Sequence, residues 1–187
     1  AASQAIENAG TEEQKAYYLP KMLSGEWSGT MCLTEAHCGT DLGMIRTRAE
    51  VDDDGYRISG NKIWITYGEH SLTKNIVHLV LARLPDAPAG TKGISMFLVP
   101  KFLDNGQLNT LACTGIESKM GQHASPTCFM SFEGARGYLL GEANTGLKHM
   151  FVMMNEARLG VGVSALAMSE IAYQRALEFA RERRQSR

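Results

Sequence analysis

The sequence predicts an α+β fold in which a central β-rich segment is flanked by a short helical segment and a long C-terminal helix. The prediction rests on changes of periodicity along the chain. Apolar residues recur at helical spacing in residues 3–23 and again from residue 145, whereas residues 29–138 form short apolar runs between turn residues. Because no helices separate these runs, we expect antiparallel strands in a barrel or a sandwich.

Composition restricts the function. The 187 residues are 44% hydrophobic and 21% charged, which is the balance of a soluble globular protein. A formal net charge of -1 gives no attraction to nucleic acid or to an anionic membrane. No apolar run approaches the roughly 18 residues that span a membrane. The four cysteines lack zinc-ligand spacing, so we expect reduced thiols, no metal site and a cytoplasmic location.

The N-terminal segment carries the signals of a helix. Thr11 is the expected N-cap, and Gln14 three residues later completes a capping box. We expect Pro20 to lie in the turn after this helix and Gly25 to end the helical segment.

Turn residues divide the middle segment into short strands. The predicted strands are residues 30–34, 45–51, 56–59, 62–66, 76–84, 94–100, 111–117 and 127–132. The run Asp52-Asp53-Asp54-Gly55 predicts a hairpin in which Gly55 supplies the positive φ, and Gly60-Asn61 predicts another turn.

The C-terminal segment predicts one long helix over residues 145–183. At 1.5 Å per residue it would be about 60 Å long. A helix of this length with a wide apolar stripe needs other helices to pack against. Because no further helix follows in the sequence and the chain does not begin with Met, we expect it to be a fragment of a larger protein.

A first candidate motif is Met-Cys-Leu-Thr-Glu-Ala-His-Cys-Gly-Thr-Asp at residues 31–41. Here an apolar strand ends in Thr34 and Glu35 and leads into a tight loop with Gly39 and Thr40. Such a loop offers backbone N–H groups and two hydroxyls, which suit a polar ring edge or a phosphate. The alternative is a loop with a structural role only.

A second candidate motif is Gly-Asn-Lys-Ile-Trp-Ile-Thr at residues 60–66. Strand alternation puts Trp64 and Thr66 on one face, where an indole and a hydroxyl can hold a flat heterocycle and bond its edge. The alternative is a core tryptophan beside a threonine whose hydroxyl is already bonded.

In this order and at this spacing, the two motifs resemble the acyl-CoA dehydrogenase family. The resemblance extends over essentially the whole chain and includes Leu140-Gly141-Glu142 and Asn155-Glu156-Ala157-Arg158. It implies that residues 1–27 end an N-terminal helical domain, that residues 28–138 form an antiparallel β-barrel that binds FAD and acyl-CoA, and that residues 139–187 begin a truncated helical domain.

The resemblance also implies the reaction. Family members use FAD to desaturate an acyl-CoA thioester: a carboxylate removes the α-proton while the β-hydrogen leaves as hydride to flavin N5. It predicts that Thr34 bonds the pyrimidine edge of the flavin, that Trp64 lies against the ring and that Thr66 points toward N5. The implied FAD-binding residues are Met31, Cys32, Leu33, Thr34, Gly39, Thr40, Trp64, Ile65, Thr66 and Arg183. The implied substrate-binding residues are Thr40 and Arg158.

Several positions depart from the family pattern. His37 and Cys38 replace small residues in the first motif, and we expect His37 to be exposed in its loop. Arg183 fits a family segment that reaches the FAD of a neighbouring subunit, but Ser186 and Arg187 do not match its Phe-Gly. Residues 68–95 look most like the branch of 3-methylmercaptopropionyl-CoA dehydrogenases, which would suggest a short or thioether acyl group.

No catalytic residue is assigned within this chain, because the family's base generally lies beyond the long helix; Glu35, Glu142 and Glu156 are not given that role. The expected partners are an acyl-CoA, an electron-transfer flavoprotein as acceptor and further copies of the protein in a homo-oligomer. The fragment alone is expected to bind FAD poorly and to be inactive. Three alternatives remain: an acyl-CoA oxidase or flavin monooxygenase on the same scaffold, a DNA-associated relative, and a non-catalytic β-barrel binding module.

Overall fold

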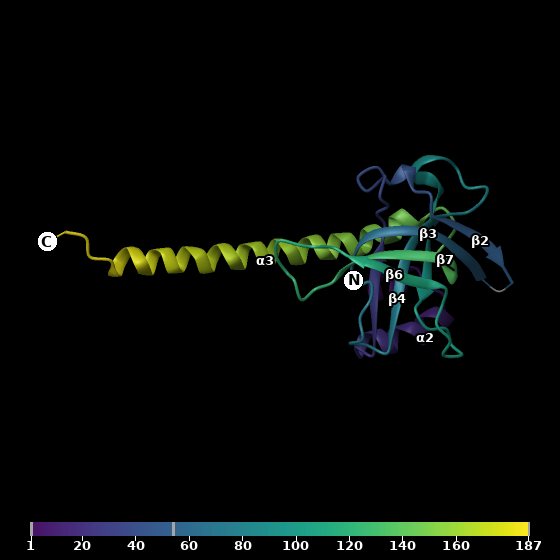
Figure 1. Ribbon diagram of the computed structural model, residues 1–187, viewed down its shortest axis with the longest axis horizontal. Coiled ribbons are helices and arrows are strands. Elements are labelled where there is room, and N and C mark those ends of the chain that lie inside the picture. The colour runs from purple at the N-terminus through teal and green to yellow at the C-terminus, as the bar shows by residue number, and fades with distance from the viewer. Residues whose placement is uncertain (1, 54, 187) are drawn as a thin grey trace. The chain divides into compact units, whose positions relative to one another are not determined.

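The computed structural model describes residues 2–53 and 55–186 and divides into two compact units, Ala1–Met153 and Met154–Arg187. The helices and strands are shown in Figure 1. The first unit contains α1 (Ala2–Ala9), α2 (Glu12–Leu23), β1 (Trp27–Cys32), the 3-10 turn η1 (Leu42–Met44), β2 (Arg48–Asp52), β3 (Gly55–Thr66), β4 (Asn75–Arg83), η2 (Gly90–Gly93), β5 (Ile94–Pro100), β6 (Leu111–Ile116) and β7 (Thr127–Leu140). Helix α3 (Gly146–Glu182) begins in this unit and continues through the second.

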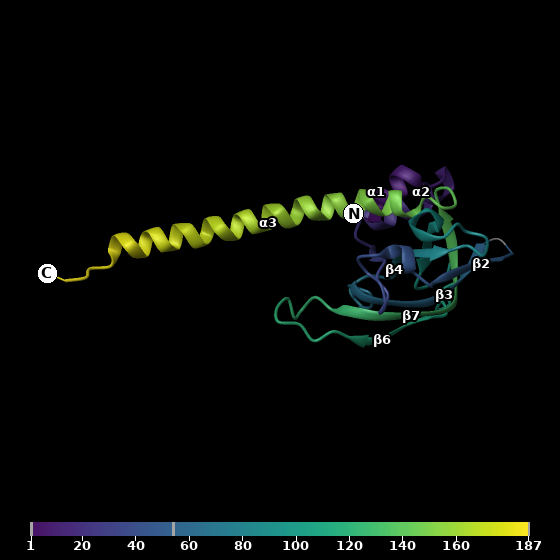
Figure 2. The same cartoon turned by 90° about the horizontal axis from the view of Figure 1, so that it is seen from above.

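The N-terminal segment forms two helices rather than one. The capping box is confirmed: the Gln14 amide donates to Thr11 Oγ1, and the Thr11 amide donates to Gln14 Oε1, both at 3.1 Å. The expectation that Pro20 lies in a turn is wrong, because it lies inside α2. Its carbonyl still accepts from the Ser24 amide at 3.1 Å, so the last turn stays closed although proline brings no N–H. Both helices contact β1, and Figure 2 shows them on the side of this unit opposite β6.

The seven strands form one mixed sheet, so the prediction of a purely antiparallel arrangement is wrong. Strand β1 runs parallel to β4 along its whole length, and β2 meets β4 in a single parallel pair, Arg48 with Arg83. The other pairings are antiparallel and complete a circuit β4–β2–β3–β7–β5–β4. The parallel pairs join strands that are distant in sequence, which hairpin signals cannot reveal.

Two of the predicted strands are joined into one at Gly60-Asn61. The strand over residues 94–100 is confirmed, but the runs 56–59 and 62–66 belong to one strand, β3, so the predicted turn at Gly60-Asn61 is wrong. Gly60 has φ +151°, beside a register shift between Ile58 and Ser59. A Cβ there would lie 2.5 Å from Thr47 Oγ1. This glycine therefore permits a close approach of two chain segments.

The predicted hairpin between β2 and β3 is confirmed, with Asp52 paired to Gly55. Asp54 lies outside the described residues. Asp53 has a positive φ of +32°, and the positive φ expected at Gly55 stays a prediction. Aspartate tolerates this conformation better than most residues.

The strands enclose an apolar core that contains a buried histidine. Cys32, Val80, Phe97 and Phe132 belong to this core. His78 is also fully buried, and its Nδ1 is hydrogen-bonded to Thr30 Oγ1 at 2.8 Å. Its Nε2 has no hydrogen-bond partner among the described residues. Burial lowers the pKa of His78 from 6.5 to about 3, so the imidazole is neutral in the folded protein near neutral pH.

Helix α3 confirms the predicted long helix, one residue shorter at each end. Within the second unit its large apolar side chains are exposed: Leu159, Val163, Leu166, Ile171 and Phe179 are each more than half accessible. Among the described residues, no helix has the combination of length and apolar character needed to cross a membrane.

The buried imidazole leads to a prediction about acid stability. Between pH 6.5 and about 3 the unfolded chain binds a proton at His78 that the folded protein does not. Stability should therefore fall with falling pH in this window, by up to about 1.4 kcal/mol per pH unit from this group. The variant His78→Gln should show a correspondingly shallower loss between pH 6 and pH 4 in urea unfolding.

The matched control is His123→Gln, which changes an exposed histidine that folding barely desolvates. This control should keep the slope of the parent chain. Equal slopes for His78→Gln and the parent chain would contradict the assignment.

Candidate functional site

A cavity of about 380 Å³ brings the two motifs together. The first motif contributes Met31, Leu33 and Thr34, and the second contributes residues 63–66. A backbone hydrogen bond from the Ile63 amide to the Thr34 carbonyl, 2.9 Å long, joins the two segments directly. Segments that lie almost thirty residues apart in the chain thus form one wall, as their pairing in the sequence suggested.

Trp64 lies on the surface of this cavity and not in the core, so the alternative of a core tryptophan is wrong. Its side chain is 57% exposed, and its Nε1 donates to Glu117 Oε2 at 3.0 Å. Its φ of +59° is rare for a bulky residue, and it coincides with a register shift between Lys62 and Ile65. Strained backbone of this kind is typical of ligand-binding sites.

The register shift also modifies the predicted alternation. Ile63, Trp64, Ile65 and Thr66 all line the cavity, although only Ile65 among them is buried. The side-chain hydroxyls of Thr34 and Thr66 have no hydrogen-bond partner among the described residues. An exposed indole beside two free hydroxyls can hold a flat heteroaromatic ring and bond its polar edge. The residues present therefore fit an isoalloxazine.

Cys32, a predicted cofactor-binding residue, has a fully buried side chain in the core and does not line the cavity. Burial raises the pKa of its thiol to about 12, so it is neutral and unreactive. Gly39 packs against Thr34, where a Cβ would lie 3.0 Å from Thr34 Cγ2. Thr40 is exposed in the loop and does not line the cavity either.

A buried ion pair supports the cavity wall from behind. Lys62 is fully buried, and its Nζ donates to Glu35 Oε1 at 2.9 Å and to the Leu33 carbonyl at 2.8 Å. Glu35 also accepts from the Thr47 hydroxyl at 2.6 Å, from the Thr47 amide at 3.0 Å and from the Arg46 amide at 2.7 Å. Both motifs and the segment just before β2 therefore meet at one carboxylate.

The environment keeps this pair charged. Burial raises the pKa of Glu35, but the Lys62 ammonium and the donors from Thr47 and Arg46 outweigh it and hold the pKa below its usual value. Burial lowers the pKa of Lys62, and the adjacent carboxylate opposes this shift. Lys62 was not among the residues predicted from the sequence. A lysine inside an otherwise apolar strand, following a motif that contributes a carboxylate, was the pattern that could have indicated a buried ion pair.

Glu35, His37 and Cys38 place three potential metal-ligand atoms within 4.8 Å of one another. The Glu35 carboxylate, however, is already bonded to an ammonium group and to three further donors. A cation there would have to compete with Lys62, so the cluster does not fit a metal. His37 is exposed, as expected, and its Nε2 lies 3.0 Å from the Met44 carbonyl.

Arg158 and Arg183, the remaining predicted site residues, lie in the second unit. Both are exposed on α3 or just after it, and the Arg183 guanidinium lies 5.5 Å from the centre of the Phe179 ring.

Comparison with known proteins assigns the family. Residues 30–135, more than half of the chain, match the family model described as acyl-CoA dehydrogenase, middle domain. The chain belongs to this family. The predicted resemblance is thereby confirmed.

Individual relatives agree with this assignment. The 3-methylmercaptopropionyl-CoA dehydrogenase of Ruegeria pomeroyi is 54% identical over 98% of this chain and 32% of its own length. The butyryl-CoA dehydrogenase of Megasphaera elsdenii has 30% identity and a TM-score of 0.80, over 98% of this chain and 46% of its own. A chain from work on the electron transferring flavoprotein of Acidaminococcus fermentans has 33% identity, a TM-score of 0.80 and the same coverage. This acyl-CoA dehydrogenase family member thus spans about a third of the Ruegeria relative.

The ion pair predicts a large and specific loss of stability in Lys62→Met. Removing one partner of a buried pair leaves an uncompensated charge, at a cost of about 3–5 kcal/mol. The control Lys74→Met breaks an exposed pair with Glu26, 3.4 Å long, which is worth about 0–1 kcal/mol. Urea unfolding of both variants measures the difference. If Lys62→Met costs no more than Lys74→Met, the pair does not hold the wall.

Proposed function

We propose that this chain supplies the flavin-binding part of an FAD-dependent acyl-CoA dehydrogenase that desaturates an acyl-CoA thioester between its α and β carbons. The observation that carries the proposal is the shared cavity of the two motifs, with its exposed indole and two free hydroxyls. Membership of the acyl-CoA dehydrogenase family supports the same reaction.

Each residue at the cavity has a defined part in this proposal. FAD, when bound, supplies the acceptor for the substrate's β-hydrogen. Thr34 would hold the polar edge of the ring, Trp64 would lie against the ring, and the Thr66 hydroxyl would face the atom that receives hydride. Because the Glu35–Lys62 pair fixes both wall segments, these groups are positioned before the substrate arrives.

The α-proton goes to a base that this chain is not proposed to supply. Glu35 cannot take that role, because its carboxylate is bonded to four donors and its pKa is held low. Glu142 is exposed after β7 and is not among the residues that line the cavity. We therefore keep the proposal that the catalytic carboxylate lies outside these residues.

The likeness to 3-methylmercaptopropionyl-CoA dehydrogenase supports a short or thioether acyl group as substrate. The likeness to the Acidaminococcus fermentans chain supports an electron-transfer flavoprotein as acceptor. A homo-oligomer is part of the proposal because Arg183 matches a family arginine that reaches a neighbouring flavin. Four free cysteines are consistent with the proposed cytoplasmic location.

The test is the flavin spectrum of the full-length protein. We expect a yellow protein that is bleached anaerobically by butyryl-CoA or 3-methylmercaptopropionyl-CoA. A yellow protein that no acyl-CoA bleaches would refute the dehydrogenase and leave the flavin site standing, and a colourless one would favour a binding module. Rapid reoxidation by oxygen, in place of an electron-transfer flavoprotein, would favour an oxidase or a monooxygenase.

Thr66→Val tests the hydroxyl at the cavity. The substitution keeps the shape but removes one hydrogen bond, worth about 1.4 kcal/mol, so the rate of bleaching should fall about tenfold. The control Thr114→Val removes an exposed hydroxyl on β6 that bonds the Phe129 carbonyl, and it should leave the rate unchanged. Equal rates in the two variants would refute the assigned role of Thr66.

A further inference from the structure

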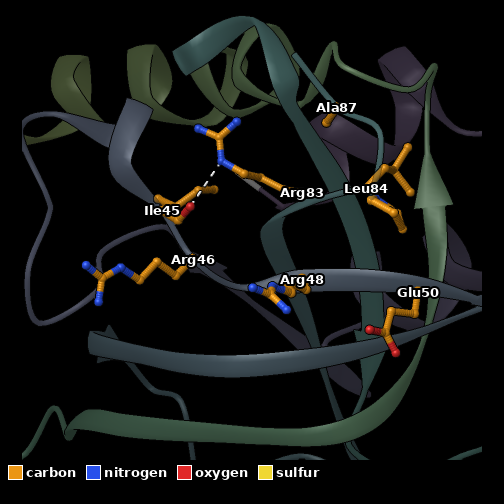
Figure 3. Close-up of a pocket in the computed structure, with 8 residues that line it drawn as sticks. Ile45, Arg46, Arg48, Glu50, Arg83, Leu84 and Ala87 are labelled. Atoms are coloured by element: carbon orange, nitrogen blue, oxygen red, sulfur yellow. Dashed lines mark hydrogen bonds between the residues drawn. The ribbon is translucent and has the colours of Figure 1, made fainter. Parts of the chain in front are cut away.

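We call the cavity at Trp64 the flavin cavity, after its proposed ligand. A second cavity, of about 570 Å³, shares none of its lining residues and is rich in arginine (Figure 3). Its charged lining residues are Arg46, Arg48, Arg83 and Glu50. Three guanidinium groups against one carboxylate give it a net positive charge, whereas the whole chain has a formal charge of -1. We call these residues, with Ile45, Leu84, Pro85 and Ala87, the arginine pocket.

Strand alternation explains why the two β2-side arginines face solvent. Thr47 and Ala49 are buried, so Arg46, Arg48 and Glu50 between and beyond them all point outward. In Figure 3 these three follow one another along the same stretch of chain. Neither the Arg46 nor the Arg48 guanidinium has a hydrogen bond or ion pair among the described residues.

Arg83 has a different task in the same pocket. It donates to the carbonyls of Ile45 at 3.0 Å, Pro88 at 3.1 Å, Gly43 at 2.5 Å and Gly90 at 2.8 Å. It thereby holds the segments before β2 and after β4 together as the pocket wall. Because all four acceptors are neutral carbonyls, its positive charge is not cancelled and adds to the field of the pocket.

The acidic groups close to the pocket leave this charge in place. Glu35, whose carboxylate accepts from the Arg46 amide, is already paired with Lys62. Asp52, further along β2, is paired with Arg57 and Arg136. Asp86 lies in the loop between lining residues but does not itself line the pocket, and Glu50 offsets only one of the three guanidinium groups.

We propose that Arg46 and Arg48 bind a phosphate ester, and that this group belongs to the nucleotide end of the acyl-CoA substrate. Guanidinium groups bind phosphate oxygens in a bidentate manner, and both of these residues line the same cavity. The identity of the ligand rests on the proposed function. The Glu35 link from the flavin cavity to the Arg46 amide fixes the two binding regions relative to each other.

The experiment uses flavin-loaded full-length enzyme and calorimetric titration with CoA, dephospho-CoA and inorganic phosphate. We expect Arg46→Gln and Arg48→Gln each to weaken CoA binding about tenfold, and to raise KM for the acyl-CoA with little change in kcat. The control Lys74→Gln removes an exposed charge beside the opposite end of β4 from Arg83 and should leave both values unchanged. Both arginines are exposed and unpaired, so the variants should keep their flavin and their fold.

Comparing CoA with dephospho-CoA shows which phosphate of the nucleotide end the arginines bind. If the parent enzyme prefers CoA to dephospho-CoA and the variants lose this preference, the arginines bind the 3′-phosphate. If the variants bind CoA and dephospho-CoA equally weakly, the arginines bind the diphosphate. Either result supports the proposal. Loss of flavin with unchanged CoA affinity would overturn it in favour of the flavin diphosphate, and no change in any affinity would overturn it entirely.

The outcome is distinguishable from failure of the proposed function. If the parent enzyme binds no acyl-CoA and none bleaches its flavin, the dehydrogenase proposal fails. If the parent enzyme binds and oxidises acyl-CoA but the arginine variants match Lys74→Gln, only the arginine pocket fails.

Discussion

The buried pair of Lys62 and Glu35 is the interaction on which the rest of the site depends. It joins the second motif to the first, and through the Thr47 and Arg46 donors it also fixes the segment just before β2. A lone ammonium in this position would carry a desolvation cost of several kcal/mol, so neither partner is tolerable without the other. The Leu33 carbonyl accepts a further hydrogen bond from the Lys62 ammonium group. One carboxylate thus sets the geometry of the flavin cavity and one wall of the arginine pocket.

This arrangement separates positioning from proton transfer. The Glu35 carboxylate behind the cavity wall is consumed by structural bonds. The groups left exposed at the cavity are the unbonded hydroxyls of Thr34 and Thr66 and the ring face of Trp64, whose N–H bonds Glu117. The left-handed backbone at Trp64 indicates that the surrounding strand holds this residue against its own preference. The chain is therefore suited to hold and orient a cofactor, with the base contributed by residues beyond it, as we propose.

The two cavities differ in the chemistry they offer. The flavin cavity presents an aromatic face and neutral hydroxyls, which suit a flat heterocycle. The arginine pocket presents the unpaired guanidinium groups of Arg46, just before β2, and Arg48, in β2, which suit a phosphate ester. Buried His78 lines neither cavity, and it bonds Thr30 and packs against the Phe132 ring among the strands. Because it stays neutral in the folded protein, it makes stability depend on pH.

The sequence by itself determined the element types, the capping box at Thr11, the long C-terminal helix and the family, because these depend on local periodicity and on motif spacing. It also paired the two motifs that form the flavin cavity. Only the tertiary structure decided the parallel pairing of β1 with β4, the position of Trp64 outside the core, and the partner of Lys62. The reason is that strand order, a register shift and a buried charge pair are long-range features. They arise when distant segments meet, and no local pattern of residues specifies which segments those are.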